Sequence, residues 1–152
     1  MATVIMLVGL PGSGKSTWAA QQKGAVVVSS DQMRIDRGGD QTTHTRDRDF
    51  WDDVRAEVAK LLKLGHDVIF DATNIDPKWR VFNSSFFLVH GAAKVVVKIF
   101  TTPLEDCLSR NALREGAARI DDEVIHHMAE QLERYPPRAG QDGLAEVEEI
   151  LS

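Results

Sequence analysis

Short apolar runs alternate along this chain with segments whose apolar residues recur every three or four positions. The runs are rich in Val, Ile and Phe and too short for most helices: residues 3–8, 25–28, 67–70 and 94–100. Runs of this kind predict parallel strands that are covered on both faces of a sheet. Residues 50–62 and 124–132 have the apolar spacing of one helix face. Strand followed by helix, repeated, predicts an α/β fold with right-handed crossovers.

Two helix starts are marked by a capping residue followed by proline. Thr102 and Glu105 form a capping box around Pro103, and Asp76 precedes Pro77. A side chain that caps the first backbone N–H groups, with proline in the first helical position, favours a helix that begins there. We therefore expect helices to begin at both places.

Two further segments are less clear. In the tail, apolar residues at 144, 147, 150 and 151 have helical spacing, whereas a strand would complete the sheet edge, and we favour the strand. The polar stretch 37–46 predicts one mobile loop. Because the chain has no internal repeat and no linker, we expect a single domain over residues 1–152.

Composition narrows the class of protein. The 152 residues, 43% hydrophobic and 27% charged, are typical of a soluble globular domain. A single cysteine, Cys107, excludes an internal disulfide and favours a reducing, cytoplasmic compartment. The first apolar run, residues 4–10, is too short to span a bilayer, so we expect no membrane partner. The net charge of −5 argues against non-specific coating of long nucleic acid but is compatible with a local basic groove.

Residues 9–16 match the phosphate-binding pattern G-x-x-x-x-G-K-[ST], directly after an apolar strand and before a helix. Its glycines let backbone N–H groups converge on phosphate oxygens, Lys15 reaches the outer phosphates, and Ser16 ligates magnesium. A glycine turn that binds nothing would not need that lysine and hydroxyl. We predict ATP and Mg²⁺ as cofactors, with nucleotide contacts from these residues: Gly9, Pro11, Gly12, Ser13, Gly14, Lys15, Ser16 and Thr17. The guanine-reading pattern Asn-Lys-x-Asp is absent, which favours a kinase.

Asp31 and Arg34 follow the second predicted strand, at the edge of the sheet where ligands of α/β proteins lie. If a helix begins at Ser30, the two side chains point the same way and place a carboxylate base beside a cation for the acceptor. The alternative is an ordinary surface ion pair. Asp71 ends the third predicted strand, and an apolar strand that ends in a carboxylate is typical of a magnesium site in P-loop proteins. We therefore predict that Ser16 and Asp71 bind the metal. Asn74 either contacts the substrate or caps the next turn.

Basic residues mark a candidate lid. Arg110 and Arg114 are four apart, so in one helix they share a face that can close over ATP. The alternative is that these arginines form a basic helix face in contact with water and bind no nucleotide. Cys107 lies on the apolar side of the same helix, which favours core packing over catalysis. Trp51 and Trp79 sit in helical apolar patterns, and we expect both in the core.

Together these residues resemble the kinase domain of the bacteriophage polynucleotide kinase family of small P-loop kinases. The motifs that carry the resemblance are Asp-x-x-Arg at 31–34, Asp-x-Thr-Asn at 71–74 and Arg-Asn-x-x-Arg at 110–114, in that order after the phosphate loop. The similarity spans nearly the whole chain. The resemblance implies a three-layer P-loop kinase fold, with a mostly parallel five-stranded sheet of order 2-3-1-4-5 and an arginine-bearing helical lid at about 103–120.

The resemblance also implies a reaction, the transfer of the ATP γ-phosphate to the 5′-OH of DNA or RNA. Asp31 matches the general base, and Lys15 and Arg114 match the other catalytic residues. Arg110 and Arg114 match lid residues at the donor nucleotide. Arg34 matches the residue that binds the acceptor's 3′-phosphate, and the match of residues 71–80 adds Asn74 and Arg80 on the substrate side. No Asp-x-Asp-Gly-Thr segment is present, so the resemblance does not extend to a phosphatase domain.

Other acceptors remain open at this stage. Kinases on this scaffold also phosphorylate nucleosides, modified DNA bases such as hydroxymethyluracil, and other small hydroxyl compounds. A nucleotide-binding protein without transfer activity would keep the phosphate loop but would not need Asp31. The sequence does not fix the acceptor or the oligomeric state.

Overall fold

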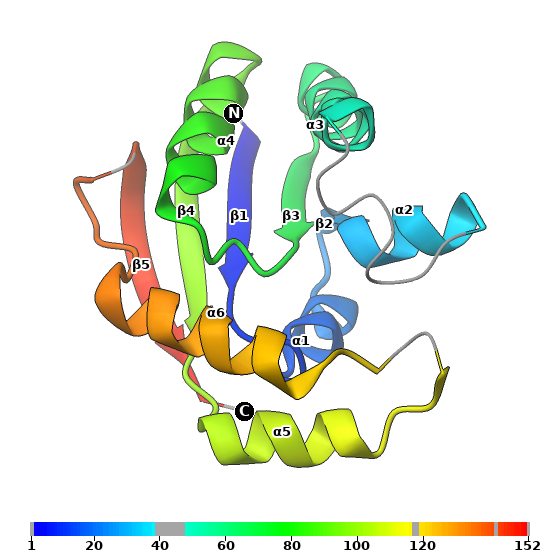
Figure 1. Ribbon diagram of the computed structural model, residues 1–152. Coiled ribbons are helices and arrows are strands. Elements are labelled where there is room, and N and C mark those ends of the chain that lie inside the picture. Colours follow the sequence, from blue (N-terminus) through cyan, green and yellow to red (C-terminus); the bar gives the residue numbers. More distant parts are fainter. Residues whose placement is uncertain (1, 39–47, 117–118, 142, 152) are drawn as a thin grey trace.

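The computed structural model describes residues 2–38, 48–116, 119–141 and 143–151 (Figure 1). The predicted loop at 37–46 therefore lies, from residue 39 on, outside the described residues, and the predicted lid at 103–120 is described except at 117–118. The elements in chain order are β1 (Ala2–Val8), α1 (Lys15–Gln21), β2 (Ala25–Ser29), α2 (Ser30–Asp36), α3 (Arg48–Lys63), β3 (Asp67–Asp71), α4 (Pro77–Val89), β4 (Ala92–Phe100), α5 (Leu104–Ala112), α6 (Asp122–Arg134) and β5 (Leu144–Ile150).

The five strands form one sheet in the order β2-β3-β1-β4-β5, as the resemblance implies. Every pair is parallel, so the carboxyl ends of all five strands lie at the same edge. Because β1 is the central strand, the loop that follows it opens at the middle of that edge. The tail at 144–150 is a strand that pairs with β4, which confirms the favoured alternative.

The two faces of the sheet are covered by different helices (Figure 1). Met6 and its alternate neighbours in β1 pack with Phe50 of α3 and Phe87 of α4 in the main core cluster. Leu7 points the other way and packs with Ala19 of α1. Of the described helices, α3, α4 and α6 thus share one face with the larger core, and the seven-residue α1 lies on the other.

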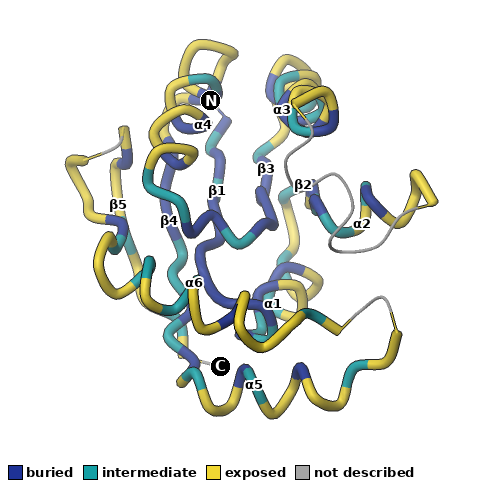
Figure 2. The backbone as a smooth tube through the Cα atoms, viewed as in Figure 1, coloured by how far each residue is buried: buried dark blue, intermediate teal, exposed yellow. Residues whose placement is uncertain are grey.

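The expectation of strands covered on both faces is only partly correct. Lys94 and Lys98 lie on the same side of β4 as Phe100, which packs toward α1. They form ion pairs across to Glu146 and Glu148 of β5, at 3.4 Å for Lys94. This outer part of the face carries charged pairs because the short α1 does not extend over it (Figure 2).

Of the two predicted helix starts, the one at Asp76 is confirmed, and the one at Thr102 lies one residue later than expected. Asp76 accepts a hydrogen bond from the Lys78 N–H, and Pro77 is the first residue of α4. At α5 the helix begins at Leu104, with Pro103 at the N-cap rather than in the first helical position. Within the described residues, no helix has the length and apolar composition to span a bilayer.

Of two side chains predicted to lie in the core, one is buried and the other is exposed. Cys107 is fully buried beside Leu10 and Ile125, as expected, and this burial raises the pKa of its thiol. Trp79 is 48% exposed, so its predicted place in the core is wrong. The reason is that α4 buries the side on which Phe87 lies, and Trp79 is on the other side of the helix.

Candidate active site

The loop between β1 and α1 has the backbone that binds phosphate. Gly12 and Gly14 have φ values of 82° and 96°, which side chains with a Cβ rarely adopt. A Cβ on Gly9 would lie 2.7 Å from Ser13 Oγ, so that position is closed to larger residues by packing. The Gly9 N–H donates to the Thr73 carbonyl at 3.1 Å, which joins the loop to the segment after β3.

Lys15 is buried at the start of α1 and turned back onto the loop. Its Nζ donates to the Leu10 carbonyl at 2.8 Å and lies 3.5 Å from Ser13 Oγ. Burial lowers the pKa of Lys15 from 10.5 to about 8, although the carboxylates of Asp71 and Asp31 act in the opposite direction. A cation held in a site with little water interacts strongly with any phosphate that enters.

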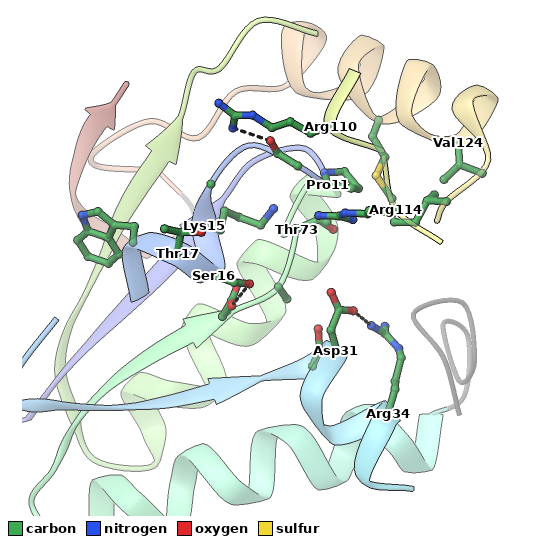
Figure 3. Close-up of a pocket in the computed structure, with 18 of the residues that line it drawn as sticks. Pro11, Lys15, Ser16, Thr17, Asp31, Arg34, Thr73, Arg110, Arg114 and Val124 are labelled. Carbon is green, nitrogen blue, oxygen red and sulfur yellow. Dashed lines mark hydrogen bonds and ion pairs between the residues drawn. The ribbon is translucent and has the colours of Figure 1, made fainter. Parts of the chain in front are cut away.

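Ser16 and Asp71 come together from neighbouring elements of the sheet edge. The Ser16 hydroxyl donates to Asp71 Oδ2 at 2.8 Å (Figure 3). Burial raises the pKa of Asp71, while this hydrogen bond and the charge of Lys15 lower it. The described residues contain no group of three or more His, Cys, Asp or Glu side chains suited to a metal. A hydroxyl and one carboxylate still fit Mg²⁺, which takes few protein oxygens and keeps several waters.

Asp31 and Arg34 form an ion pair of 2.6 Å at the start of α2 (Figure 3). Ser29 caps the helix by accepting from the Gln32 N–H, so the turn that carries both residues is fixed. The Arg34 side chain is 7% exposed and its guanidinium lies 5.3 Å from the ring centre of Trp51. The Asp31 side chain is 48% exposed. Because its partner Arg34 is buried, this is not an ordinary surface ion pair: a buried arginine holds an accessible carboxylate.

The lid arginines approach the loop from α5 and from the turn after it. Arg110 Nη1 donates to the Gly12 carbonyl at 2.9 Å, and the Thr102 hydroxyl donates to the Ser13 carbonyl at 2.9 Å. The helix ends at Ala112, so Arg114 does not share a helix face with Arg110 as predicted. Both arginines nevertheless line the same cavity.

A cavity of about 900 Å³ gathers most of the predicted residues (Figure 3). The predicted residues that line it are Pro11, Gly12, Gly14, Lys15, Ser16, Thr17, Asp31, Arg34, Asp71, Arg110 and Arg114. Gly9 and Ser13 belong to the loop but are buried within it and do not line the cavity. Their direct contact with a nucleotide stays a prediction.

Asn74 and Arg80 are buried and do not line the cavity, so their contact with substrate stays a prediction. Asn74 has φ 50°, and its side-chain amide donates to the Leu7 carbonyl at 2.7 Å. Arg80 is 1% exposed and donates to the carbonyls of Asn74 at 3.1 Å, Ile75 at 2.7 Å and Tyr135. Both side chains therefore fix the loop after β3, and Arg80 also ties it to the end of α6.

Sequence reasoning missed one wall of the cavity. The residues at the start of α6 that line it are Ile120, Asp121, Val124 and Met128. Val124 and Met128 were assigned only to a helix face, because periodicity does not tell a core from a cavity wall. Trp51, expected in the core, packs against it and also lines the cavity. Trp18, Gln21, Ile150 and Leu151 are further lining residues that no motif marked.

Comparisons with known proteins agree with this geometry. A family model described as an AAA domain, AAA_33, matches residues 4–135. The chain is similar to a chain of the Pnkp1/Rnl/Hen1 RNA repair complex, at 27% identity and a TM-score of 0.76, over 88% of this chain and 44% of that one. A second structure of the Pnkp1/Rnl/Hen1 complex gives 30% identity and a TM-score of 0.64, over 72% of this chain and 38% of that one. The chain thus spans less than half the length of these relatives.

A more distant structure shows the fold alone. The APS kinase CysC of Mycobacterium tuberculosis, solved with AMPPNP and APS, has 19% identity and a TM-score of 0.59, over 87% of this chain and 98% of that one. The family match covers most of the chain, and the sheet order and phosphate loop agree with it. The chain therefore belongs to the AAA domain family AAA_33 and has the fold of small P-loop kinases.

Proposed function

We propose that the chain transfers the γ-phosphate of ATP to the 5′-OH of a DNA or RNA end. One observation carries this proposal: the accessible Asp31 carboxylate, held by the buried Arg34, lines the same cavity as Lys15. An enzyme that only hydrolysed ATP would not need a carboxylate and a buried cation beside the phosphate site. The similarity to chains of an RNA repair complex supports a nucleic acid as acceptor.

On the donor side, the loop N–H groups and the start of α1 receive the phosphates. Lys15 leaves the Leu10 carbonyl and binds the outer phosphates, and Arg114 approaches them from the opposite wall. Ser16 and Asp71 would hold Mg²⁺ with its waters, and the metal when bound neutralises charge that develops on the phosphates. Closure of these groups over the nucleotide excludes water from the transfer.

On the acceptor side, Asp31 accepts the proton of the 5′-OH as its oxygen attacks the γ-phosphorus. The bond from that phosphorus to the bridging oxygen breaks, and ADP leaves with the electron pair. Arg34 binds the phosphate on the 3′ side of the same nucleotide, since its planar cation beside Asp31 suits that anion. Val124 and Met128 give the cavity an apolar wall on which a nucleotide base can pack.

The test is a transfer assay with ATP, Mg²⁺ and a panel of acceptors. The panel contains 5′-OH DNA, 5′-OH RNA, a 3′-mononucleotide, free nucleosides and hydroxymethyluracil-containing DNA, and a 5′-phosphorylated DNA serves as the matched control. We expect labelled phosphate at the 5′ terminus of the 5′-OH strands and none on the control. Transfer to nucleosides, to the modified base or to another small hydroxyl compound alone would reject a polynucleotide acceptor.

A further inference from the structure

A stripe of exposed apolar side chains follows α4 on the side turned away from the core. Trp79, Phe82, Phe86 and Val89 are spaced by three, four and three residues, so they lie along one side of the helix. Phe82 is 50% exposed and Val89 is 81% exposed, like Trp79 beside them. Trp79, Phe82 and Val89 are exposed, whereas Phe86 between them is half-buried and packs against the main core and the His90 ring.

The neighbouring side of α3 turns the C-terminal end of this stripe into a groove. Ala56, Ala59, Lys60 and Lys63 face Phe86, Val89, His90 and Gly91 across a hollow of about 650 Å³. Among the described residues that line it, Lys60, Lys63 and His90 are basic and none is acidic. The groove is thus apolar at its floor and basic at its rim, in a chain whose net charge is −5.

Arg55 holds the two most exposed rings in place. Its guanidinium lies 5.6 Å from the ring centre of Trp79 and 5.0 Å from that of Phe82. Asp52 at 2.8 Å and Asn83 at 3.2 Å accept hydrogen bonds from it. The rings meet edge to face at 5.5 Å. Their orientation is therefore set before any partner arrives, which lowers the cost of ordering them on binding.

One helix, α3, contributes to both the cavity and the groove. Trp51 lines the cavity, and Arg55, one helical turn later, contacts Trp79 of α4. Arg55 contacts the first turns of α4, and residues 56–63 face its last turn, so the two helices run in the same direction. The segment from Trp79 to His90 is about 16 Å long.

We propose that this aromatic groove, formed by residues 55–63 of α3 and 79–90 of α4, binds the single-stranded part of the acceptor beyond its 5′ end. The proposal rests on the proposed function, because it needs a polynucleotide acceptor. Bases stack on Trp79 and Phe82, as in sites that bind single strands without reading sequence. Lys60, Lys63 and His90 face the backbone phosphates. A protein helix would equally suit an apolar groove, but the basic side chains at its rim, with no acidic residue among those that line the hollow, favour the strand.

The test compares acceptors of different length in the intact chain. With the parent protein, kcat/KM is expected to rise from a 3′-mononucleotide to an eight-nucleotide 5′-OH strand. Trp79→Ala and Phe82→Ala should each lower the ratio of the two kcat/KM values about fivefold or more, since stacking on one aromatic ring has that effect. Val81→Ala is the matched control, because Val81 is exposed on α4 but belongs neither to the stripe nor to the residues that line the hollow, and its ratio should stay at the parental value.

Direct binding separates this proposal from the proposed function. A 3′-fluorescein 5′-OH strand of twelve deoxythymidines is titrated without ATP, and its anisotropy gives Kd at two salt concentrations. We expect a higher Kd for Trp79→Ala and for Lys60→Glu with Lys63→Glu, with a shallower salt dependence for the double change. Parental ratios and Kd values in all groove variants would overturn the proposal while 5′ transfer stands, and would leave the groove to a protein partner. Absence of 5′ transfer from the parent itself would instead reject the proposed function.

Discussion

The two halves of the cavity are built in different ways. The loop half, residues 9–17, is one uninterrupted segment whose shape comes from glycine backbone and one buried lysine. The helix half collects Asp31, Trp51 and Val124 from three helices that are far apart in the sequence. A contiguous loop can be moved between proteins as a motif, whereas the helix half depends on how α2, α3 and α6 pack. In the proposed function the loop half receives the donor phosphates and the helix half receives the acceptor.

Removing the cation of the loop half should have the largest effect. Lys15→Ala is expected to abolish transfer to every acceptor, because the outer phosphates lose the buried charge that receives them. Phosphate transfer and the far-ultraviolet circular dichroism spectrum are measured together. Lys23→Ala, which removes an exposed lysine just after α1, is the control. Near-parental transfer by folded Lys15→Ala protein would show that the loop half does not act as described.

Removing the base of the helix half should leave ATP binding intact. Asp31→Asn keeps the shape of the side chain but cannot accept the proton, so kcat should fall at least about a hundredfold. The Kd for ATP, measured by calorimetry, should change little. Asp36→Asn, in the same helix and outside the cavity, is the control. A kcat within a few-fold of the parent's would place the base elsewhere.

Arg34 should separate acceptors from one another. Arg34→Ala is expected to raise KM about tenfold or more for acceptors with a 3′-phosphate, since hydrogen bonds to a charged group of this kind are worth that much. KM for a free nucleoside should rise much less. Arg34→Lys restores the charge and tests whether the planar guanidinium matters. Equal losses on all acceptors would mean that Arg34 only supports the fold, and thermal unfolding of each variant checks this directly.

The smallest expected effect is on stability and depends on pH. Because the folded pKa of Lys15 is about 8, below the ordinary 10.5, the unfolded chain binds more protons between these values. The free energy of unfolding of the nucleotide-free parent should therefore rise through this window relative to Lys15→Met, by on the order of 1 kcal/mol. Below pH 8 the lysine is charged in both the folded and the unfolded state, and there the buried charge lowers the free energy of unfolding of the parent most. Urea unfolding of both proteins at pH 7 and pH 10 measures the difference, and a difference that does not change with pH would show that Lys15 is not desolvated.

The sequence was sufficient where a local pattern determines the structure. The strands, the loop at 9–16 and the placement of Asp31 beside Arg34 all follow from contiguous residues, and the structure has them as expected. The loop pattern works because glycine backbone and a neighbouring helix start are properties of the segment itself.

Sequence patterns did not show where a side chain meets a distant backbone or which side of a helix is buried. Arg80 has the charge of a substrate ligand, but its donors are used by carbonyls as far away as Tyr135. Asn74 similarly reaches the Leu7 carbonyl across the sheet edge. Trp79 and Val124 fit helical apolar patterns, yet one is exposed and the other lines the cavity. Which side of a helix becomes buried is decided by the neighbouring elements, and periodicity alone does not contain that information.

The charged pairs between β4 and β5 also bear on how copies of this chain behave in concentrated solution. Among the described strands, β4 is the one neighbour of β5, so the outer edge of β5 carries free backbone hydrogen-bonding groups. Open edges of this kind can template the growth of one sheet onto another. Glu146, Glu148 and Glu149 along β5 would face the same carboxylates in a second copy, and Lys94 and Lys98 are already engaged within the chain. Edge-to-edge aggregation is thus opposed by repulsion between the carboxylates of neighbouring copies.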